Sequence, residues 1–417
     1  MNLSSRVTTR WLDDHRPLLD FVPDGTSPWA WLHEGDGLVG WGTAFTSEPG
    51  SGPDRFAHSQ HAFDEIAEHA VIDDEVLLPG TGLVAFGSFA FADDNPTSLL
   101  VVPRIAVGRR GGATWLTTIT VDGQPHIADD LRDAASPRVP AVSDRPRYAG
   151  SSIPDVNWLE AVATAVDRIR GGHLDKVVLA RDVALWSRHR FDVIDIAARL
   201  NRRFASCYTF IADGLAGATP ELLAARFDRQ VTSRVLAGTA ARGTDTDHDD
   251  QLGSELADSP KEQWEHRLAV QSVRNVLEAV SDHVSGDDHP FLLKLENVQH
   301  LATDFTAEVR DDESALEVAA ALHPTAAVGG FPRQPALDLI TELEQMDRGR
   351  YAAPVGWVDA KRNGEWGIAL RCAQFEGARA RLFAGVGVVE GSLPEAELAE
   401  TRLKLLAMQS VIGASDD

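Results

Sequence analysis

The chain has 417 residues, 43% of them hydrophobic and 24% charged, which is the balance of an ordinary globular protein. This length allows two or three average domains or one unusually large domain, with a core that needs no disulfide or structural metal to fold. The formal net charge of −24 repels anionic surfaces and therefore excludes nucleic acid and acidic membranes as partners.

The start of the chain and its cysteines favour a cytoplasmic location. No apolar run follows residues 1–6, so we expect no signal peptide, and no stretch approaches the roughly 18 apolar residues of a membrane helix. Cys207 and Cys372 lie far apart without a CxxC pattern, as is typical of buried thiols in a reducing compartment. An anionic substrate would be repelled by so acidic a chain, so its site would have to gather positive charge locally.

Residues 1–150 are rich in Gly, Pro and Asp, and turn residues separate short apolar runs at 83–86 and 99–102. This pattern predicts an N-terminal β-rich part. The polar, proline-bearing stretch 134–146 is the best linker candidate, although a surface loop would have the same composition. Residues 151–417 form the second part.

Helical and strand patterns alternate in this second part. Because both hairpins and helices separate its strands, we expect a mixed α+β fold and not a regular βαβ series. The expected elements are a helix over 157–170, a strand over 176–185, a helix over 192–204, a strand over 207–212 and a hairpin turn at 227–231.

Two later helices are expected to begin with a serine cap in a capping box and a proline in the first turn, in the sequences Ser-Pro-Lys-Glu at 259–262 and Ser-Leu-Pro-Glu at 392–395. The first helix carries Glu262 and Glu265 on one face, and the second carries Glu397, Glu400 and Lys404 in one stripe. Two such carboxylate pairs could hold one magnesium ion, which prefers oxygen ligands. Capping, the helix dipole and an ordinary surface ion pair explain the same acids equally well.

The run 385–391, Gly-Val-Gly-Val-Val-Glu-Gly, is similar to a dinucleotide-binding fingerprint but has Glu390 where the third glycine belongs. The chain also ends before a second strand could supply the ribose-binding acid, and no Walker A sequence is present. Nucleotide binding is therefore not expected. The glycines more simply indicate a backbone that approaches another group closely.

Lys176 and Glu221 are two further candidates, each with an ordinary alternative. Lys176 opens an apolar strand, where it could be a desolvated base or a lysine whose ammonium reaches water. Glu221 lies between a turn and an apolar strand, where it could be a buried protonated acid or a capping residue. The residues alone do not decide between these interpretations.

Ordered short blocks over residues 155–412 resemble the chorismate-utilising enzymes, the family of anthranilate, aminodeoxychorismate, isochorismate and salicylate synthases. Residues 1–150 match this family weakly. The blocks are KVVLAR at 176–181, GATPELL at 217–223, LAGT at 236–239, EH at 265–266, HPTA at 323–326, IALRCA at 368–373, AGVG at 384–387 and ETRLK at 400–404.

The resemblance implies a role for each matched residue. Glu265 and Glu400 match the magnesium ligands, and Glu262 and Glu397 match acids that support the ion or its waters. The magnesium ion would bind the ring carboxylate of chorismate, and with Arg371 and Lys404 it would supply the local positive charge that an acidic chain needs. The implied substrate-binding positions are Gly238, Thr239, His323, Tyr351, Arg371, Gly385 and Lys404.

Lys176 stands where the water-adding members carry a lysine base, and Glu221 where the family carries the acid that protonates the departing C4 hydroxyl. These roles require a neutral lysine and a protonated glutamate near neutral pH. The block 299–305, with the small Ala302 near the substrate, and the block 323–332 resemble the isochorismate synthases; amine-adding enzymes usually have threonine at the place of Ala302. We therefore expect an isochorismate synthase without a glutamine amidotransferase partner.

Two alternatives remain. A salicylate synthase shares the water-adding step and then eliminates pyruvate, and a catalytically silent protein could keep the chorismate pocket. The fold implied by the resemblance is a single large α+β domain, in which two antiparallel sheets form a central sandwich flanked by helices. The product could enter menaquinone or siderophore biosynthesis.

Overall fold

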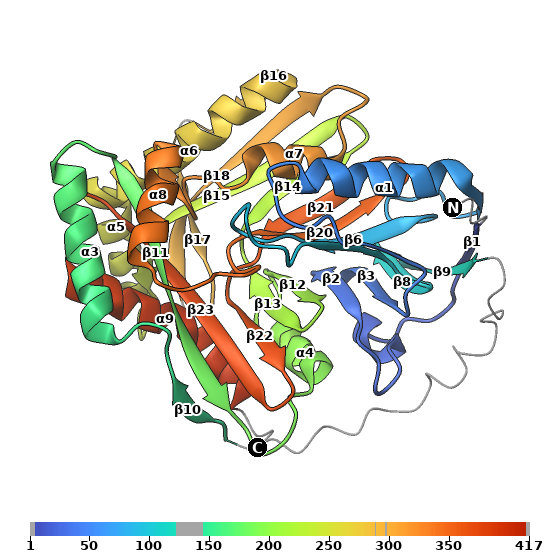
Figure 1. Ribbon diagram of the computed structural model, residues 1–417, viewed down its shortest axis with the longest axis horizontal. Coiled ribbons are helices and arrows are strands. Elements are labelled where there is room, and N and C mark those ends of the chain that lie inside the picture. Colours follow the sequence, from blue (N-terminus) through green and yellow to red (C-terminus); the bar gives the residue numbers. More distant parts are fainter. Residues whose placement is uncertain (1–4, 122–144, 288, 297, 414–417) are drawn as a thin grey trace.

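The computed structural model describes residues 5–121, 145–287, 289–296 and 298–413. Within these residues two large β-sheets form the centre of a mixed α+β fold, and helices flank them (Figure 1). The expected linker at 134–146 lies almost entirely outside the described residues.

The larger sheet has 13 strands, with β19 (Gly330–Phe331) paired to β11 beside the main path. In spatial order the main path is β10 (Arg147–Gly150), β11 (Lys176–Trp186), β23 (Arg379–Val388), β22 (Cys372–Glu376), β13 (Leu215–Thr219), β12 (Tyr208–Ala212), β2 (Trp29–His33), β3 (Asp36–Trp41), β8 (Ile105–Arg110), β9 (Ala113–Val121), β1 (Ser5–Trp11) and β5 (Ala70–Asp74).

The smaller sheet has 10 strands, with β17 (Phe291–Lys294) paired to β18 beside the main path. The main path is β16 (Ser281–Gly286), β18 (Val298–Val309), β15 (Gln230–Ala241), β14 (Leu222–Phe227), β21 (Gly364–Ile368), β20 (Pro354–Asp359), β6 (Val84–Ser88), β7 (Leu99–Val102) and β4 (Phe45–Ser47). Among the described strands, β1 and β5 pair parallel, so the larger sheet departs at this edge from the expected antiparallel arrangement.

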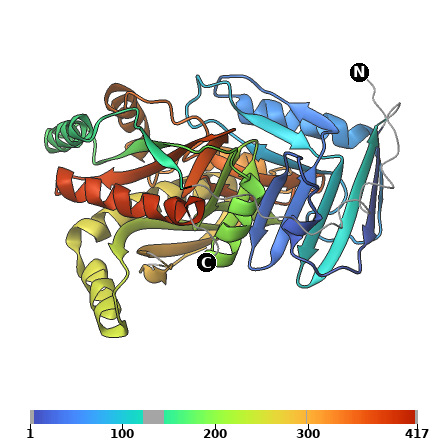
Figure 2. The same ribbon diagram turned by 90° about the horizontal axis from the view of Figure 1, so that it is seen from below.

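Strands from the first 150 residues lie in both sheets, together with strands from the rest of the chain. Figure 2 shows the early strands, in blue to teal, at one end of the molecule and α9, in red, toward the other end. The helices are α1 (Arg55–His69), α3 (Asp155–Arg170), α4 (Val193–Arg203), α5 (Thr246–Asp258), α6 (Pro260–Val280), α7 (Ala315–Leu322), α8 (Arg333–Leu343) and α9 (Pro394–Ile412), with a short 3-10 helix at Leu18–Phe21.

The expected elements of the second part are confirmed within one or two residues as α3, β11, α4 and β12. The expected hairpin is also confirmed, because Phe227 of β14 pairs with Gln230 of β15. The hydroxyl of Ser259 caps α6 by accepting the N–H of Glu262 at 3.4 Å, which is the serine half of the expected capping box.

The second capping prediction was wrong. Leu393 is the N-cap residue of α9 and provides no side-chain cap, and the hydroxyl of Ser392 instead accepts the N–H of Val389 at 3.1 Å. The reason is the position of proline. Pro260 directly follows its serine, whereas Leu393 separates Ser392 from Pro394, the first residue of the helix.

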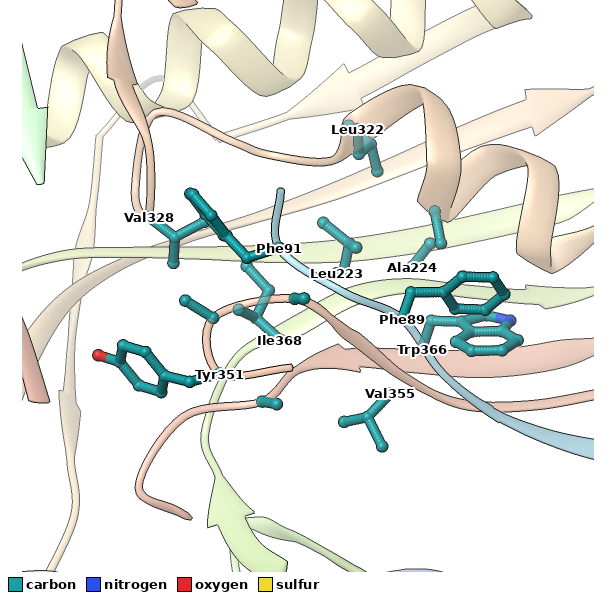
Figure 3. Close-up of a cluster of buried hydrophobic side chains, with 14 of the residues drawn as sticks. Phe89, Phe91, Leu223, Ala224, Leu322, Val328, Tyr351, Val355, Trp366 and Ile368 are labelled. Carbon is teal, nitrogen blue, oxygen red and sulfur yellow. The ribbon is translucent and has the colours of Figure 1, made fainter. Parts of the chain in front are cut away.

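One hydrophobic cluster packs the two sheets against each other and includes Trp31 of the larger sheet and Trp366 of the smaller sheet. In Figure 3 the rings of Phe89 and Trp366, 5.7 Å apart, lie at one end of the cluster, and Tyr351 lies at the other end. Burial of this apolar surface is the main favourable term in folding. Among the described residues, no helix combines the length and apolarity that a membrane crossing requires.

Candidate active site

A narrow cavity of about 60 Å³ opens between β11 and β23 of the larger sheet and β15 of the smaller sheet. Eight of the catalytic, substrate-binding and metal-binding residues predicted from the sequence line this cavity. They are Glu221, Gly238, Thr239, Glu265, Tyr351, Arg371, Gly385 and Lys404. The fold thus gathers at one place residues that are far apart in the sequence.

Lys176 begins β11 and is fully buried behind this cavity. Its Nζ lies 3.0 Å from Oε1 of Glu265, an ion pair that lacks the alignment of a hydrogen bond. Nζ of Lys176 forms no hydrogen bond with the described residues, although buried polar groups normally have such partners. The N–H bonds of Lys176 are therefore available to a water molecule or a ligand.

Glu221 lies between β13 and β14, and only 3% of its surface is exposed. Burial raises its pKa to about 8, because a carboxylate is poorly solvated there. The backbone N–H of Leu236 and the charges of Lys176, Arg371 and Lys404 oppose this shift without cancelling it. A carboxyl group with this pKa is mostly protonated at neutral pH, which is the state that the family resemblance requires of Glu221.

Arg371 and Lys404 bring positive charge to the cavity wall. Arg371 follows β21 in a left-handed backbone conformation with φ of 47° and is half-buried in the cavity wall. Lys404 of α9 donates a hydrogen bond to the carbonyl oxygen of Gly385 at 2.9 Å and lies 2.7 Å from Oε1 of Glu400. The local positive charge required for an anionic ligand is therefore present.

A bulge in β15 shapes the opposite wall. The register between β15 and β18 shifts from Ala237 to Thr239, and the intervening Gly238 has φ of 81°. A Cβ atom at Gly238 would lie 3.2 Å from Oε2 of Glu262. Glycine is therefore favoured here by its backbone conformation and by the close approach of α6.

His300 also lines the cavity, and the sequence analysis did not single it out. Burial and the charge of Arg371 hold its pKa well below the ordinary value, so the ring is neutral. Ala302, which the resemblance puts near the substrate, is fully buried in β18 and is not part of the cavity wall. Because side chains alternate along a strand, His300 shares a face with Ala302, and this period could have identified it.

His323 lies away from the cavity, unlike the other predicted substrate-binding residues. Its ring packs near Phe56 and Phe91, and its Nε2 lies 3.1 Å from the carbonyl oxygen of Phe91. Burial lowers the pKa of His323 to about 3, so the ring is neutral at physiological pH. An aromatic cage and a backbone hydrogen bond account for this histidine without a ligand.

The four acids of the predicted metal site lie near one another on α6 and α9, and each is paired with a lysine. Lys404 pairs with Glu400 and Lys176 with Glu265, while Glu262 and Glu397 share Lys261. Within the described ranges, no three acidic, histidine or cysteine side chains are arranged as a ready set of metal ligands.

Electrostatic effects show how closely these acids are grouped. Burial and then the charge of Glu265 raise the pKa of Glu262. Burial likewise raises the pKa of Glu397, and the charge of Glu400 adds to the effect. For Glu400 burial acts in the same direction, but the charge and hydrogen bond of Lys404 outweigh it and lower the pKa.

The donor set fits a hard divalent cation. Carboxylate oxygens are the ligands that magnesium prefers, and like charges held close together gain from a shared cation. Glycine at 387 lets the carboxylate of Glu265 lie against the backbone of β23, because a Cβ atom there would be 2.0 Å from Oε1 of Glu265. Metal binding would require the lysine partners to release these carboxylates.

Known proteins resemble this chain in sequence and in fold. Residues 29–413 match the family model described as chorismate binding enzyme. The isochorismate synthase MenF of Bacillus subtilis is 38% identical over 261 residues, which cover 62% of this chain and 55% of that protein. The match therefore spans little more than half the length of that relative.

Two further comparisons extend over more of the chain. The putative isochorismate synthase MenF of Mycobacterium tuberculosis is 33% identical over 353 residues, covering 81% of this chain and 88% of that protein. The solved structure of MenF, the menaquinone-specific isochorismate synthase from Escherichia coli, has a TM-score of 0.81 at 26% identity, covering 98% of this chain and 95% of that one. This chain belongs to the chorismate-binding enzyme family.

Proposed function

We propose that this protein is an isochorismate synthase, an isomerase that converts chorismate to isochorismate. The observation that carries the proposal is that Glu221, Arg371 and Lys404 line one cavity, while Lys176 lies buried behind it, 3.0 Å from the lining residue Glu265. A base, an acid and two cations are the groups that addition of water to a dianionic ring requires. The names of the relatives from B. subtilis and M. tuberculosis support the same activity.

In the proposed reaction, Arg371 and Lys404 bind the carboxylates of chorismate and fix the position of the ring. Lys176, in its neutral form, accepts a proton from a water molecule whose oxygen bonds to C2. Glu221 donates its proton to the C4 hydroxyl, which leaves as water while the ring double bonds shift. Water is therefore added at C2 and lost at C4, so that substrate and product have the same composition.

We assign the proposed magnesium site to Glu265 and Glu400, with Glu262 and Glu397 supporting the ion or its waters. Bound magnesium supplies positive charge for the ring carboxylate of chorismate. The four carboxylates and the close approach of Gly387 to Glu265 support this assignment. Chorismate, a small molecule, is the partner that the proposal needs. No glutamine amidotransferase enters it, because water and not ammonia is the nucleophile.

The proposal also includes a cytoplasmic location, supported by two cysteines, Cys207 and Cys372, that are both free and buried. Either menaquinone or siderophore biosynthesis could use the product. The E. coli structure is named for menaquinone, whereas a relative from Pseudomonas aeruginosa, 42% identical over 62% of this chain and 55% of that protein, is named for salicylate biosynthesis.

The test is to incubate the purified protein with chorismate and magnesium and to identify the products. Isochorismate released into solution is the expected result. Salicylate and pyruvate without free isochorismate would instead identify a salicylate synthase. No turnover by folded protein with bound metal would identify a catalytically silent binding protein.

A further inference from the structure

Lys261, the second residue of α6, connects the acids of two helices. Its Nζ lies 3.1 Å from Oε1 of Glu262 on α6 and 2.8 Å from Oε1 of Glu397 on α9. Its charge also acts on Glu265 and Glu400. One ammonium group thus interacts with all four carboxylates of the candidate metal site.

The surroundings of Lys261 differ from those of an ordinary surface lysine. Its side chain is 29% exposed, whereas that of Glu397 is only 2% exposed. A buried carboxylate without a counter-charge is costly, so in the metal-free protein this lysine balances Glu397. The partial exposure of Lys261 also matters, because a long flexible side chain at the edge of a site can turn toward water.

We propose that Lys261 is an internal counter-cation that holds Glu262 and Glu397 in the metal-free protein and releases them when a divalent cation binds. This inference rests on the proposed function, because it concerns the same acid cluster. The ammonium and the cation require the same carboxylate oxygens. Lys261 is therefore a competitor that sets the affinity of the site for metal and limits filling of the site at low magnesium concentration.

Calorimetric titration with magnesium, in the absence of chorismate, measures the competition. K261M removes the charge and keeps much of the side-chain volume, so we expect it to bind magnesium about tenfold more tightly than the natural protein. K261R keeps a cation and should bind magnesium no more tightly than the natural protein. In EDTA, K261M should also unfold at a lower temperature, because Glu397 loses its counter-charge.

Lys294 provides a matched control, because it also joins two carboxylates, Asp249 at 3.0 Å and Asp250 at 2.7 Å. These acids lie outside the candidate site, on α5, so K294M should leave magnesium affinity unchanged. An equal gain of affinity in K261M and K294M would reflect a general change of net charge and would overturn the inference.

Displacement of Lys261 from the carboxylates by magnesium is measured by chemical labelling of lysines with an amine-reactive ester, followed by mass spectrometry. Magnesium should increase the labelling of Lys261 severalfold and leave that of Lys294 unchanged. If magnesium binds but labelling of Lys261 does not rise, or K261M binds magnesium no more tightly, the inference is wrong and the proposed function stands. If the natural protein neither binds magnesium nor converts chorismate, both are wrong.

Discussion

Nε2 of His300 lies 3.2 Å from Nη2 of Arg371, and this contact fixes the tautomer of the histidine. On the other side of the ring, Nδ1 lies 3.1 Å from the carbonyl oxygen of Gly238, which can only accept a hydrogen bond. Nδ1 therefore carries the proton, and Nε2 accepts a hydrogen from Arg371, which can only donate. His300 thus orients the guanidinium that we propose to bind chorismate.

Replacing His300 with alanine should raise KM for chorismate more than it lowers kcat, because Arg371 loses the group that orients it. A hydrogen bond to a charged group contributes about 1.5–3 kcal/mol, so kcat/KM should fall by about 10- to 100-fold. H300Q, whose amide oxygen can accept from Arg371, should recover part of the loss. Steady-state kinetics of both variants test this, and an unchanged KM in H300A would contradict the role.

The raised pKa of Glu221 predicts the pH dependence of the reaction. The carboxyl group is protonated below its pKa of about 8 and loses its proton above it. Because the proposed acid must be protonated, kcat/KM for chorismate should fall as the pH rises through 8. A pH profile of the natural protein would show this limb, and a flat profile up to pH 9.5 would contradict the assignment of Glu221.

The raised pKa of Glu221 also predicts how the stability of the folded protein changes with pH. The pKa of Glu221 rises from 4.5 to about 8 on folding, so between these values the folded protein keeps a proton that the unfolded chain releases. The contribution of Glu221 to stability is present below pH 4.5 and is lost as the pH rises through 8. E221Q stays neutral, so its Tm relative to the natural protein should increase from pH 5 to pH 8 and then level off. If the difference in Tm between E221Q and the natural protein stayed constant from pH 5 to pH 8, the raised pKa of Glu221 would be contradicted.

A side chain at Gly387 of β23 should force the neighbouring side chains to move. A Cβ atom there would lie 2.0 Å from Oε1 of Glu265 and 2.9 Å from Cε of Lys176. G387A should therefore displace this ion pair and lower kcat/KM at least about tenfold, in line with the cost of a misplaced catalytic group. At Gly391, the nearest atom to an added Cβ is 4.0 Å away, so G391A is the matched control and should retain activity. Equal kcat/KM values of G387A and G391A would contradict the close packing of Glu265 and Lys176 against Gly387.

Removing the proposed base should separate chemistry from binding. K176A should lower kcat by about 10²- to 10⁴-fold, the usual contribution of a positioned acid or base, and leave the Kd for chorismate within a few fold. E400A should instead weaken magnesium and chorismate binding together. Single-turnover kinetics and calorimetry distinguish the two effects, and normal turnover by K176A would exclude Lys176 as the base.

Local patterns in the sequence predicted α3, β11 and α4, because the period of apolar residues and the capping residues lie within each element. The same patterns did not decide whether Lys176 is a desolvated base or a lysine whose ammonium reaches water. Its burial depends on β23, where Val177 pairs with Val388 about 200 residues later in the chain. The pattern of apolar residues within one segment cannot predict a pairing between strands so far apart in the sequence.

The family resemblance supplied partners for the candidate residues but not their geometry. It assigned His323 to the substrate, although an aromatic cage holds this residue elsewhere. It also gave no reason to consider Lys261 or His300, whose positions depend on the approach of α9 to α6 and on the bulge in β15. The order of motif blocks therefore predicted which segments meet, whereas the side-chain contacts had to come from the folded chain.

The most direct test of the central claim is conversion of chorismate in water enriched in oxygen-18, with magnesium present and the products identified by mass spectrometry. If Lys176 activates water for addition at C2 while the C4 hydroxyl departs, the protein should release isochorismate with one labelled oxygen at C2. Isochorismate without the label, or salicylate and pyruvate in place of free isochorismate, would contradict this account.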